Sequence, residues 1–316
     1  MSNPAPLPLS PGRQAWRRFK KNRPAVGSAW YLGLLILALS LWPLLLHVIG
    51  GHFGHDHDPN QLSDAQFAPP DAWHWFGTDV HGRDLFSRVL YGAQISLLVG
   101  LVGTLVSLVI GVIWGAVAGY VGGRVDSFLM RVVDILYSLP SIIFVIVLIT
   151  TLGELLKQLP WVVKSPAMSA ALRVVLLFVG LGAVSWLTMA RIVRGQVLAL
   201  KAQQFVAAAQ ALGQSHFKIL ARHLLPNLLG IVVVYLTLTV PAVILDESFL
   251  SFLGLGIQPP QASWGSLLAN GAEVINPIRS NWWLLVFPAM AMCVTLLALN
   301  FLGDAIREAA DPRARQ

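Results

Sequence analysis

Charge is scarce in this sequence, and cysteine is almost absent. Charged residues make up 12% of the 316 residues, whereas 56% of the residues are hydrophobic. An ordinary soluble domain carries about 25% charged residues, so the composition excludes that class. Cys293 is the only cysteine, which excludes a disulfide framework. Because the apolar residues also gather in long blocks, the sequence indicates an integral membrane protein.

The common signatures of catalysis are missing as well. The sequence contains no G-x-x-x-x-G-K-[ST] phosphate loop, no H-E-x-x-H zinc helix and no G-x-S-x-G nucleophile turn. The net charge of +7 does not indicate nucleic-acid binding, because the basic residues flank apolar segments and form no patch interleaved with aromatic residues. We therefore expect no enzyme, no partner nucleic acid, and no metal or cofactor bound by this chain.

Six charge-free stretches are candidates for membrane spans. A bilayer core of roughly 30 Å needs about 20 apolar residues in a helix, and only helices or closed barrels satisfy their backbone polar groups in lipid. The sequence therefore predicts an all-α integral membrane protein with six transmembrane helices. The predicted spans are 26–49, 91–123, 135–153, 174–190, 227–245 and 281–303.

The Lys and Arg residues predict the orientation of these spans. Most of the 22 fall on one side of the membrane if the N-terminus is cytoplasmic, which is the usual excess on the inner face. We expect a multi-pass membrane protein with both termini in the cytoplasm. The expected divisions are a basic N-terminal tail at 1–25, a first span at 26–49, an external loop at 50–90, a core with five spans at 91–303 and a C-terminal tail at 304–316.

The N-terminal tail carries the segment WRRFKK at 16–21. Alternating bulky apolar and basic residues suit the surface of an anionic lipid leaflet, so membrane lipid is an expected partner. Plain anchoring by positive charge explains the segment equally well.

The segment after the first span is rich in histidine. Six of the eight histidines lie between residues 47 and 81, and two aspartates stand among them. Imidazole suits nickel, copper and zinc, but the spacing matches no closed zinc site. We expect a solvated external loop without a resident metal. The residues are His47, His52, His55, His57, His74 and His81, with Asp56 and Asp58.

The second predicted span carries a small residue at every fourth position. Such residues lie on one helix face and let another backbone approach closely. We expect this helix to be central in the bundle, either in static packing or in a contact that slides during transport. The stripe consists of Gly103, Ser107, Gly111, Gly115 and Gly119.

Two groups of charged residues lie at the ends of spans. Asp246 and Glu247 end the fifth span and are candidates for a translocation path, where they attract the amine of a cationic or zwitterionic solute. Interfacial anchoring explains them equally well. Arg131 and Asp134 are expected to pair on one helix face. Pro140 is expected to kink the helix that follows.

A polar, basic segment at 204–227 separates the fourth and fifth spans. The sequence QFVAAAQALGQSHFKILARHLLPN predicts two short helices that are broken at Gly213 and closed by Pro226. Ser215 is the expected N-cap of the second helix.

This segment has the pattern of a docking element. We expect the second helix to pack an apolar face on the bundle and to present its polar face to a partner. A helix lying on the lipid surface fits the pattern nearly as well. The expected apolar face consists of Phe217, Leu220, Ala221 and Leu224. The residues expected to serve the partner contact are Gln204, Phe205, Ala207, Ala208, Gln210, Gly213, Ser215, His216, Lys218, Arg222 and Pro226.

Four blocks occur in a specific order along the chain. They are FGTDVHGRDLFSR at 76–88; MRVVD at 130–134 followed by Pro140; FVAAAQALG at 205–213 followed by HLLPN at 223–227; and SFLGLG at 251–256 followed by PP at 259–260 and SWG at 263–265. Together they resemble the membrane subunits of binding-protein-dependent ABC importers, and among these the C-type permeases of oligopeptide and dipeptide systems. The third block is similar to the EAA loop of that family. The resemblance extends over nearly the whole chain, from 16–21 to 311–312.

The resemblance implies the transmembrane domain of a type I ABC importer, located in the bacterial inner membrane. Such a subunit is not itself an enzyme, and it couples ATP hydrolysis in partner subunits to the translocation of di- or oligopeptides. The implied partners are a homologous B-type permease, two cytoplasmic ATPase subunits that bind ATP and Mg, and an external solute-binding protein.

The loop at 204–227 is the implied docking element for one ATPase subunit, but it departs from the family pattern. Ala207 replaces the signature glutamate, and Phe205 replaces the usual neighbouring tyrosine. We therefore expect no salt bridge there, and a residue such as Gln204 or Gln210 makes the polar contact if one is kept.

Other functions remain open from the sequence. Related ABC importers carry nickel, glutathione or oligosaccharides, and the histidine-rich loop is compatible with nickel. A self-sufficient secondary transporter predicts inverted repeats and charges at the membrane midplane, and neither is evident. A purely structural membrane anchor leaves the loop at 204–227 unexplained. The external stretch at 154–173 has no assigned role.

Overall fold

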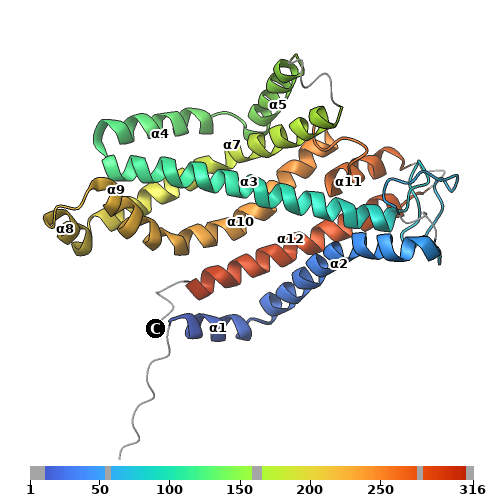
Figure 1. Cartoon of the computed structure of the whole chain (residues 1–316), viewed down its shortest axis with the longest axis horizontal. Coiled ribbons are helices and arrows are strands. Elements are labelled where there is room, and N and C mark those ends of the chain that lie inside the picture. The colour runs from blue at the N-terminus through green and yellow to red at the C-terminus, as the bar shows by residue number, and fades with distance from the viewer. Residues whose placement is uncertain (1–10, 54–57, 159–165, 276–279, 311–316) are drawn as a thin grey trace, which may run out of the picture.

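The computed structural model describes residues 11–53, 58–158, 166–275 and 280–310, which form an elongated helical bundle (Figure 1). The α-helices are α1 (Pro11–Lys21), α2 (Arg23–Phe53), α3 (Leu85–Val121), α4 (Gly123–Tyr137), α5 (Ser141–Lys157), α7 (Pro166–Lys201), α8 (Gln204–Ala211), α9 (His216–Ile219), α10 (Leu225–Phe252), α11 (Trp264–Glu273) and α12 (Trp283–Ala310). A π-helical turn, η2 (Leu220–Leu224), joins α9 to α10.

Five of the described helices are long and apolar enough to cross a membrane. They correspond to five of the six predicted spans, but each helix continues past its apolar stretch because polar and basic residues extend it beyond the lipid core. The fourth predicted span, 174–190, lies inside the much longer α7. The five candidate spans are Arg23–Trp42, Leu85–Val121, Val174–Lys201, His216–Phe252 and Trp283–Ala309.

The third predicted span is wrong as a single helix over 135–153. The chain leaves its helical path after Tyr137, and α5 makes an angle of 91° with α4. Pro140 stands directly before α5, and proline removes a backbone hydrogen bond and clashes with the preceding turn. The expected kink is therefore a complete break, and α4 and α5 together form a broken span or a re-entrant segment.

The stripe of small residues on α3 faces α7 and α10. A Cβ atom added at Gly111 would lie 2.6 Å from the Cβ of Met189, and one added at Gly119 would lie 2.8 Å from the carbonyl oxygen of Arg194. Near the other end of the stripe, a Cβ at Gly103 would lie 2.9 Å from Val243 on α10. The stripe is buried throughout, so α3 is a central helix whose backbone lies against its neighbours.

The external loop is attached to the start of α3 by a buried carboxylate. Asp79 accepts a hydrogen bond from Nε of Arg83 at 2.7 Å and from the Arg83 backbone N–H at 3.0 Å, and Nε of Arg88 lies 3.5 Å from it. Asp84 then caps α3 by accepting the backbone N–H of Ser87 at 2.9 Å. The G-T-D-x-x-G-R-D block is therefore a structural unit that fixes the external loop to the bundle.

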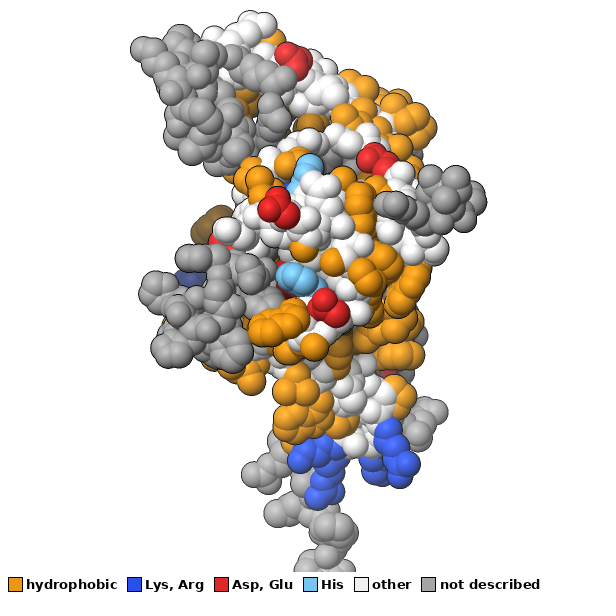
Figure 2. Space-filling model, turned by 90° about the vertical axis from the view of Figure 1, so that its right-hand side faces the viewer, with side chains coloured by type: hydrophobic (Ala, Val, Ile, Leu, Met, Phe, Trp, Pro, Cys, Tyr) orange, Lys and Arg blue, Asp and Glu red, His pale blue; other side chains and the backbone are white. Residues whose placement is uncertain are grey.

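The two ends of the bundle differ in composition. In Figure 1, α1, the end of α12 and the α8–α9 loop lie at one end, whereas α11 and the external loop lie at the other. Figure 2 looks onto the external-loop end, where acidic and histidine side chains are visible and the Lys and Arg side chains lie mainly at the lower margin. The predicted tail segments 1–10 and 311–316 lie outside the described residues.

Candidate functional site

A short helical loop joins α7 to α10 at the end of the bundle that carries α1 (Figure 1). Gly213 has a φ of +72°; its N–H donates to the carbonyl of Gln210 at 2.9 Å, and the N–H of Gln214 donates to that of Ala209 at 3.2 Å. These paired bonds form a Schellman C-cap on α8. Ser215 then caps α9. The structure thus has the predicted break and the predicted N-cap.

One face of this loop is buried against three long helices. The buried residues Val206 and Ala209 on α8, Ile219 on α9 and Leu224 in η2 are at most 4% exposed. They belong to one hydrophobic cluster with side chains of α3, α7 and α10, among them Tyr120, Val193, Val197 and Leu228. Because close-packed apolar contacts transmit displacement, a force on the loop reaches all three helices.

The apolar face predicted for the second helix is wrong in part. Leu224 is buried and Leu220 packs against the same cluster, as predicted. Phe217 and Ala221 are exposed, and the second fully buried residue of this face is Ile219. Ile219 and Leu224 are five apart, which is the spacing of the π-helical turn between them. A strict 3.6-residue period therefore cannot find this face.

Pro226 does not close the second helix. The chain continues from α9 through η2 into α10, and the helical run His216–Phe252 is long enough to form one span. Pro226 stands in the first turn of α10, directly after the π-helical turn η2.

The opposite face of the loop is exposed and partly apolar. Leu212 is 80% exposed and Phe217 is 81% exposed, on either side of Gly213. Large apolar side chains at the tip of a polar loop are typical of a protein contact. All the residues predicted for that contact are also exposed: Gln204, Phe205, Ala207, Ala208, Gln210, Gly213, Ser215, His216, Lys218, Arg222 and Pro226.

Polar bonds hold the loop to the end of α3. The hydroxyl of Tyr120 lies 2.9 Å from Nδ1 of His216, and Nζ of Lys201 donates to the Tyr120 carbonyl at 2.6 Å. Within the loop, Nε2 of His223 lies 2.9 Å from Oε1 of Gln214. Both histidines of the loop are therefore structural, and sequence reasoning did not assign them these partners.

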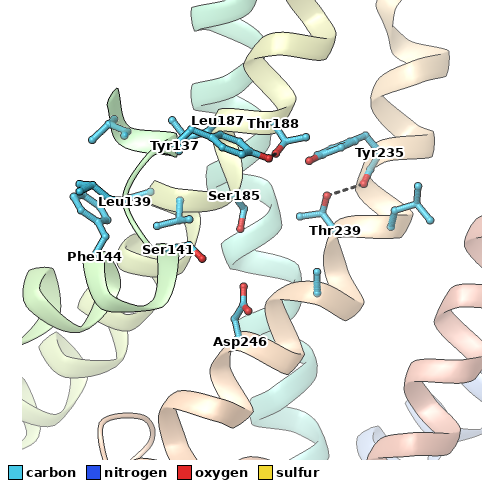
Figure 3. A pocket seen from close by; sticks show the side chains of 15 residues that line it. Tyr137, Leu139, Ser141, Phe144, Ser185, Leu187, Thr188, Tyr235, Thr239 and Asp246 are labelled. Atoms are coloured by element: carbon cyan, nitrogen blue, oxygen red, sulfur yellow. Dashed lines mark hydrogen bonds between the residues drawn. The ribbon is translucent and has the colours of Figure 1, made fainter. Parts of the chain in front are cut away.

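A second site lies in the middle of the bundle, where the break between α4 and α5 opens a cavity of about 360 Å³ (Figure 3). α7 and α10 form the other walls. The cavity is only partly enclosed by the single subunit, and its lining mixes apolar and hydroxyl side chains with one carboxylate. The polar lining residues are Tyr137, Ser141, Ser185, Thr188, Tyr235, Thr239 and Asp246.

The two adjacent carboxylates at the end of the fifth predicted span face different surroundings. Asp246 lines the cavity and is half-buried, whereas Glu247 is fully buried in the bundle. One step along an α-helix turns the side chain by about 100°, so adjacent residues cannot share a face. The prediction that Glu247 faces a hydrated path is wrong, and Asp246 alone lines the cavity.

Glu247 is instead surrounded by hydroxyl groups. The Ser251 hydroxyl donates to its Oε1 at 2.5 Å, and Ser96, Ser248 and Ser263 lie near this carboxyl group. These serines come from α3, from α10 and from the residue that caps α11. Among the described residues, Oε2 of Glu247 has no hydrogen-bond partner.

Asp134 on α4, which was predicted to pair with Arg131, has a different partner. Asp134 accepts a hydrogen bond from Arg191 on α7 at 2.8 Å, and not from Arg131 as predicted. The guanidinium of Arg191 also lies over the ring of Tyr137, 4.2 Å from its centroid. The interaction ties the end of α4 to α7 directly before the break.

Comparison with known proteins identifies the class to which this architecture belongs. Residues 111–316 match the family described as the binding-protein-dependent transport system inner membrane component. The chain belongs to this family. Residues 10–70 also match the N-terminal transmembrane domain of oligopeptide transport permease C.

Curated relatives of this permease extend over nearly its full length. It is 44% identical to the dipeptide transport system permease protein DppC of Bacillus subtilis, over 98% of this chain and 88% of that protein. It is 47% identical to the oligopeptide transport system permease protein OppC of Escherichia coli K12, over 96% and 93%. It is 34% identical to the glutathione transport system permease protein GsiD of Pectobacterium atrosepticum, over 97% and 92%.

A solved structure has the same fold as this permease. An inward-facing form of the MetNI methionine ABC transporter superposes with a TM-score of 0.53 at 19% identity, over 72% of this chain and 98% of that one. The fold is therefore that of a type I ABC importer transmembrane domain. In this family the permease is a multi-pass subunit of the bacterial inner membrane, and separate ATPase subunits and a solute-binding protein complete the transporter.

The histidine-rich segment of the permease forms no metal cluster among the residues that the structure describes. Nδ1 of His74 lies 3.2 Å from Asp84. The backbone N–H of His74 donates to Asp71, which lowers the pKa of that exposed carboxyl group below its usual value. His55, Asp56 and His57 lie outside the described residues, as does 159–165 of the external stretch at 154–173.

Proposed function

We propose that this permease forms one half of the translocation pathway of an ATP-driven importer of dipeptides and oligopeptides. The observation that carries the coupling role is the α8–α9 loop, which presents Leu212 and Phe217 to the exterior while its other face is packed on α3, α7 and α10. The names of the DppC and OppC relatives, at 44% and 47% identity, favour peptides as the solute.

The second half of the pathway is a homologous B-type permease. In support of this proposal, the cavity beside the α4–α5 break is only partly enclosed by the single subunit. A solute in transit needs a closed passage, and an opposing permease surface supplies the missing wall. ATP and Mg are bound by the two ATPase subunits, to which the exposed loop at 204–227 docks.

Both termini lie in the cytoplasm in this proposal. α1, the end of α12 and the α8–α9 loop lie at the same end of the bundle, and the loop has to face the ATPase subunits. The basic residues of α1 suit the anionic inner leaflet. Its aromatic residues suit the interface as well: Trp16 stacks on Phe19, and Nζ of Lys20 lies over the Trp16 ring.

Deletion of the gene tests the proposed solute. We expect loss of uptake of a labelled tripeptide, restored by a plasmid-borne copy, with nickel uptake unchanged in the same cells. Normal tripeptide uptake in the deletion strain, with no second peptide importer expressed, contradicts the proposal. Loss of nickel uptake alone would place the protein among the metal importers of the family. The described residues contain no cluster of metal-ligating side chains in support of that function.

A further inference from the structure

The cavity beside the α4–α5 break contains a single charged group. Asp246 is the only charged residue among the 15 side chains that line it. Among the residues that the structure describes, no side chain forms an ion pair with Asp246 or donates a hydrogen bond to it. An unpaired carboxylate within a membrane-spanning segment is costly and marks a functional position. When Asp246 is ionised, the cavity therefore has a net negative charge that a bound cation neutralises.

Hydroxyl groups on two helices line the same cavity as this carboxylate. The close-up shows Asp246 pointing into the cavity toward Ser185 on α7, with Thr239 on the same helix as Asp246 (Figure 3). The hydroxyls of Ser185 and Thr239 donate to the carbonyls of Leu181 and Tyr235, at 3.1 and 2.8 Å. Because their protons are used in this way, their oxygens remain acceptors, and an ammonium group brings three donors to such a set.

The other lining side chains carry no charge that would select for a particular side chain of the solute. Leu136, Leu139 and Phe144 supply an apolar wall on the side of the break. No positive side chain lines the cavity, and Arg191, three residues after Thr188 on α7, is bonded to Asp134. The cavity therefore recognises one positive group and tolerates varied side chains.

We propose that Asp246 binds the α-ammonium group of the peptide as it passes through the permease, with Ser185 on the facing helix accepting a further hydrogen bond. This inference rests on the proposed peptide function and deepens it. Asp246 is then a specificity-determining residue of the translocation path, separate from the selection made by the binding protein. A neutral or amino-blocked peptide lacks the group that compensates the buried charge.

The test uses the complete transporter in proteoliposomes, with the binding protein supplied outside. Uptake of a tripeptide and of its N-acetylated form is measured at concentrations that saturate the binding protein, whose affinity for each is measured separately so that delivery can be divided out. The variants are Asp246→Asn, Asp246→Ser and Asp246→Glu. Glu273→Gln, an exposed carboxylate on α11, is the matched control, and copurification of the partner subunits verifies assembly.

We expect both neutral variants to import the free tripeptide about tenfold more slowly, in line with the loss of a charge-assisted hydrogen bond. Uptake of the acetylated peptide should stay within about twofold of wild type, and Asp246→Glu and Glu273→Gln should keep the preference for the free amine. Equal losses for both peptides, or no loss for either, overturn the inference while leaving the peptide function intact. Failure of the wild-type transporter to import any peptide overturns the proposed function and the inference together.

Discussion

The structure requires glycine at Gly213, after α8, and at Gly115, in α3, for different reasons. A Cβ at Gly213 meets nothing within 4 Å, while the φ of +72° disfavours any L side chain. Gly115 has an ordinary helical backbone, but a Cβ there would collide with the Ala190 carbonyl. Space and backbone conformation are thus separate constraints, and substitutions at the two positions should fail in separate ways.

Replacing Gly213 should affect coupling more than assembly. Gly213→Leu places a side chain in the left-handed region at a cost of roughly 1–2 kcal/mol, which disturbs the Schellman cap between α8 and α9. We expect an assembled complex in which ATP hydrolysis continues and uptake falls several-fold, measured together in proteoliposomes. Gly213→Asn, which tolerates this conformation, is the control. Normal uptake by the Gly213→Leu complex contradicts the role assigned to the loop.

Asp79 is predicted to be essential for the stability of the external loop. Asp79→Asn removes the charge that the buried Arg83 and Arg88 face. Breaking a buried pair in this way typically costs about 3–5 kcal/mol. We expect a lower melting temperature of the purified complex by several degrees, while the exposed Asp64→Asn serves as the control. An unchanged melting temperature contradicts the structural role of this carboxylate.

At the scale of elements, sequence patterns found the helices but missed the points where they are interrupted. The small-residue stripe on α3 follows a simple four-residue period, and the structure places it against α7 and α10. The π-helical turn at 220–224 follows no such period, because its side chains align only once Ile219 and Leu224 pack in the same cluster. Pro140 predicts an interruption of the helix. The angle of 91° between α4 and α5 depends on how α5 packs against α7, which the sequence does not show.

The candidate sites show the same limit. The exposed face of the loop at 204–227 was predictable, since a polar segment between apolar spans has to face water or a partner. The sequence could not predict that Asp246 lines the cavity while Glu247 is buried. Both residues are acidic, and only the rotation of α10 about its axis decides which one faces the cavity. The burial of Glu247 among serines from three elements leaves no local pattern in the sequence.

The contact between α3 and α7 gives a prediction at this scale. Gly115→Ala should weaken the complex, since the added methyl has to displace the α7 backbone at Ala190. The matched control is Gly195→Ala on α7, where a Cβ meets nothing within 4 Å and alanine favours the helix by about 1 kcal/mol. We expect the melting temperature to fall for the first variant and to stay or rise for the second. Equal behaviour of the two variants contradicts close backbone packing.

For the whole molecule, the arrangement of the ends predicts the topology. α1, the C-terminal end of α12 and the α8–α9 loop share one end of the bundle (Figure 1). We expect reporter tags fused before residue 1 and after residue 316 to be protected from a protease added to spheroplasts, in which only the outer face of the inner membrane is accessible. A tag inserted in the external loop at Asp64, an exposed position, should be cleaved. Cleavage of either terminal tag contradicts the proposed orientation.

The helical run His216–Phe252 reaches from the α8–α9 loop past the cavity that Asp246 lines. Ser215 and Asp246 are about 30 residues apart, which at 1.5 Å per residue is roughly 45 Å. The π-helical turn η2 and Pro241 both lie between these two residues, and helices bend at such features. In the proposed transporter, one continuous segment of chain therefore joins the surface that receives the ATPase to the cavity carboxylate, and it has two defined points at which it can flex.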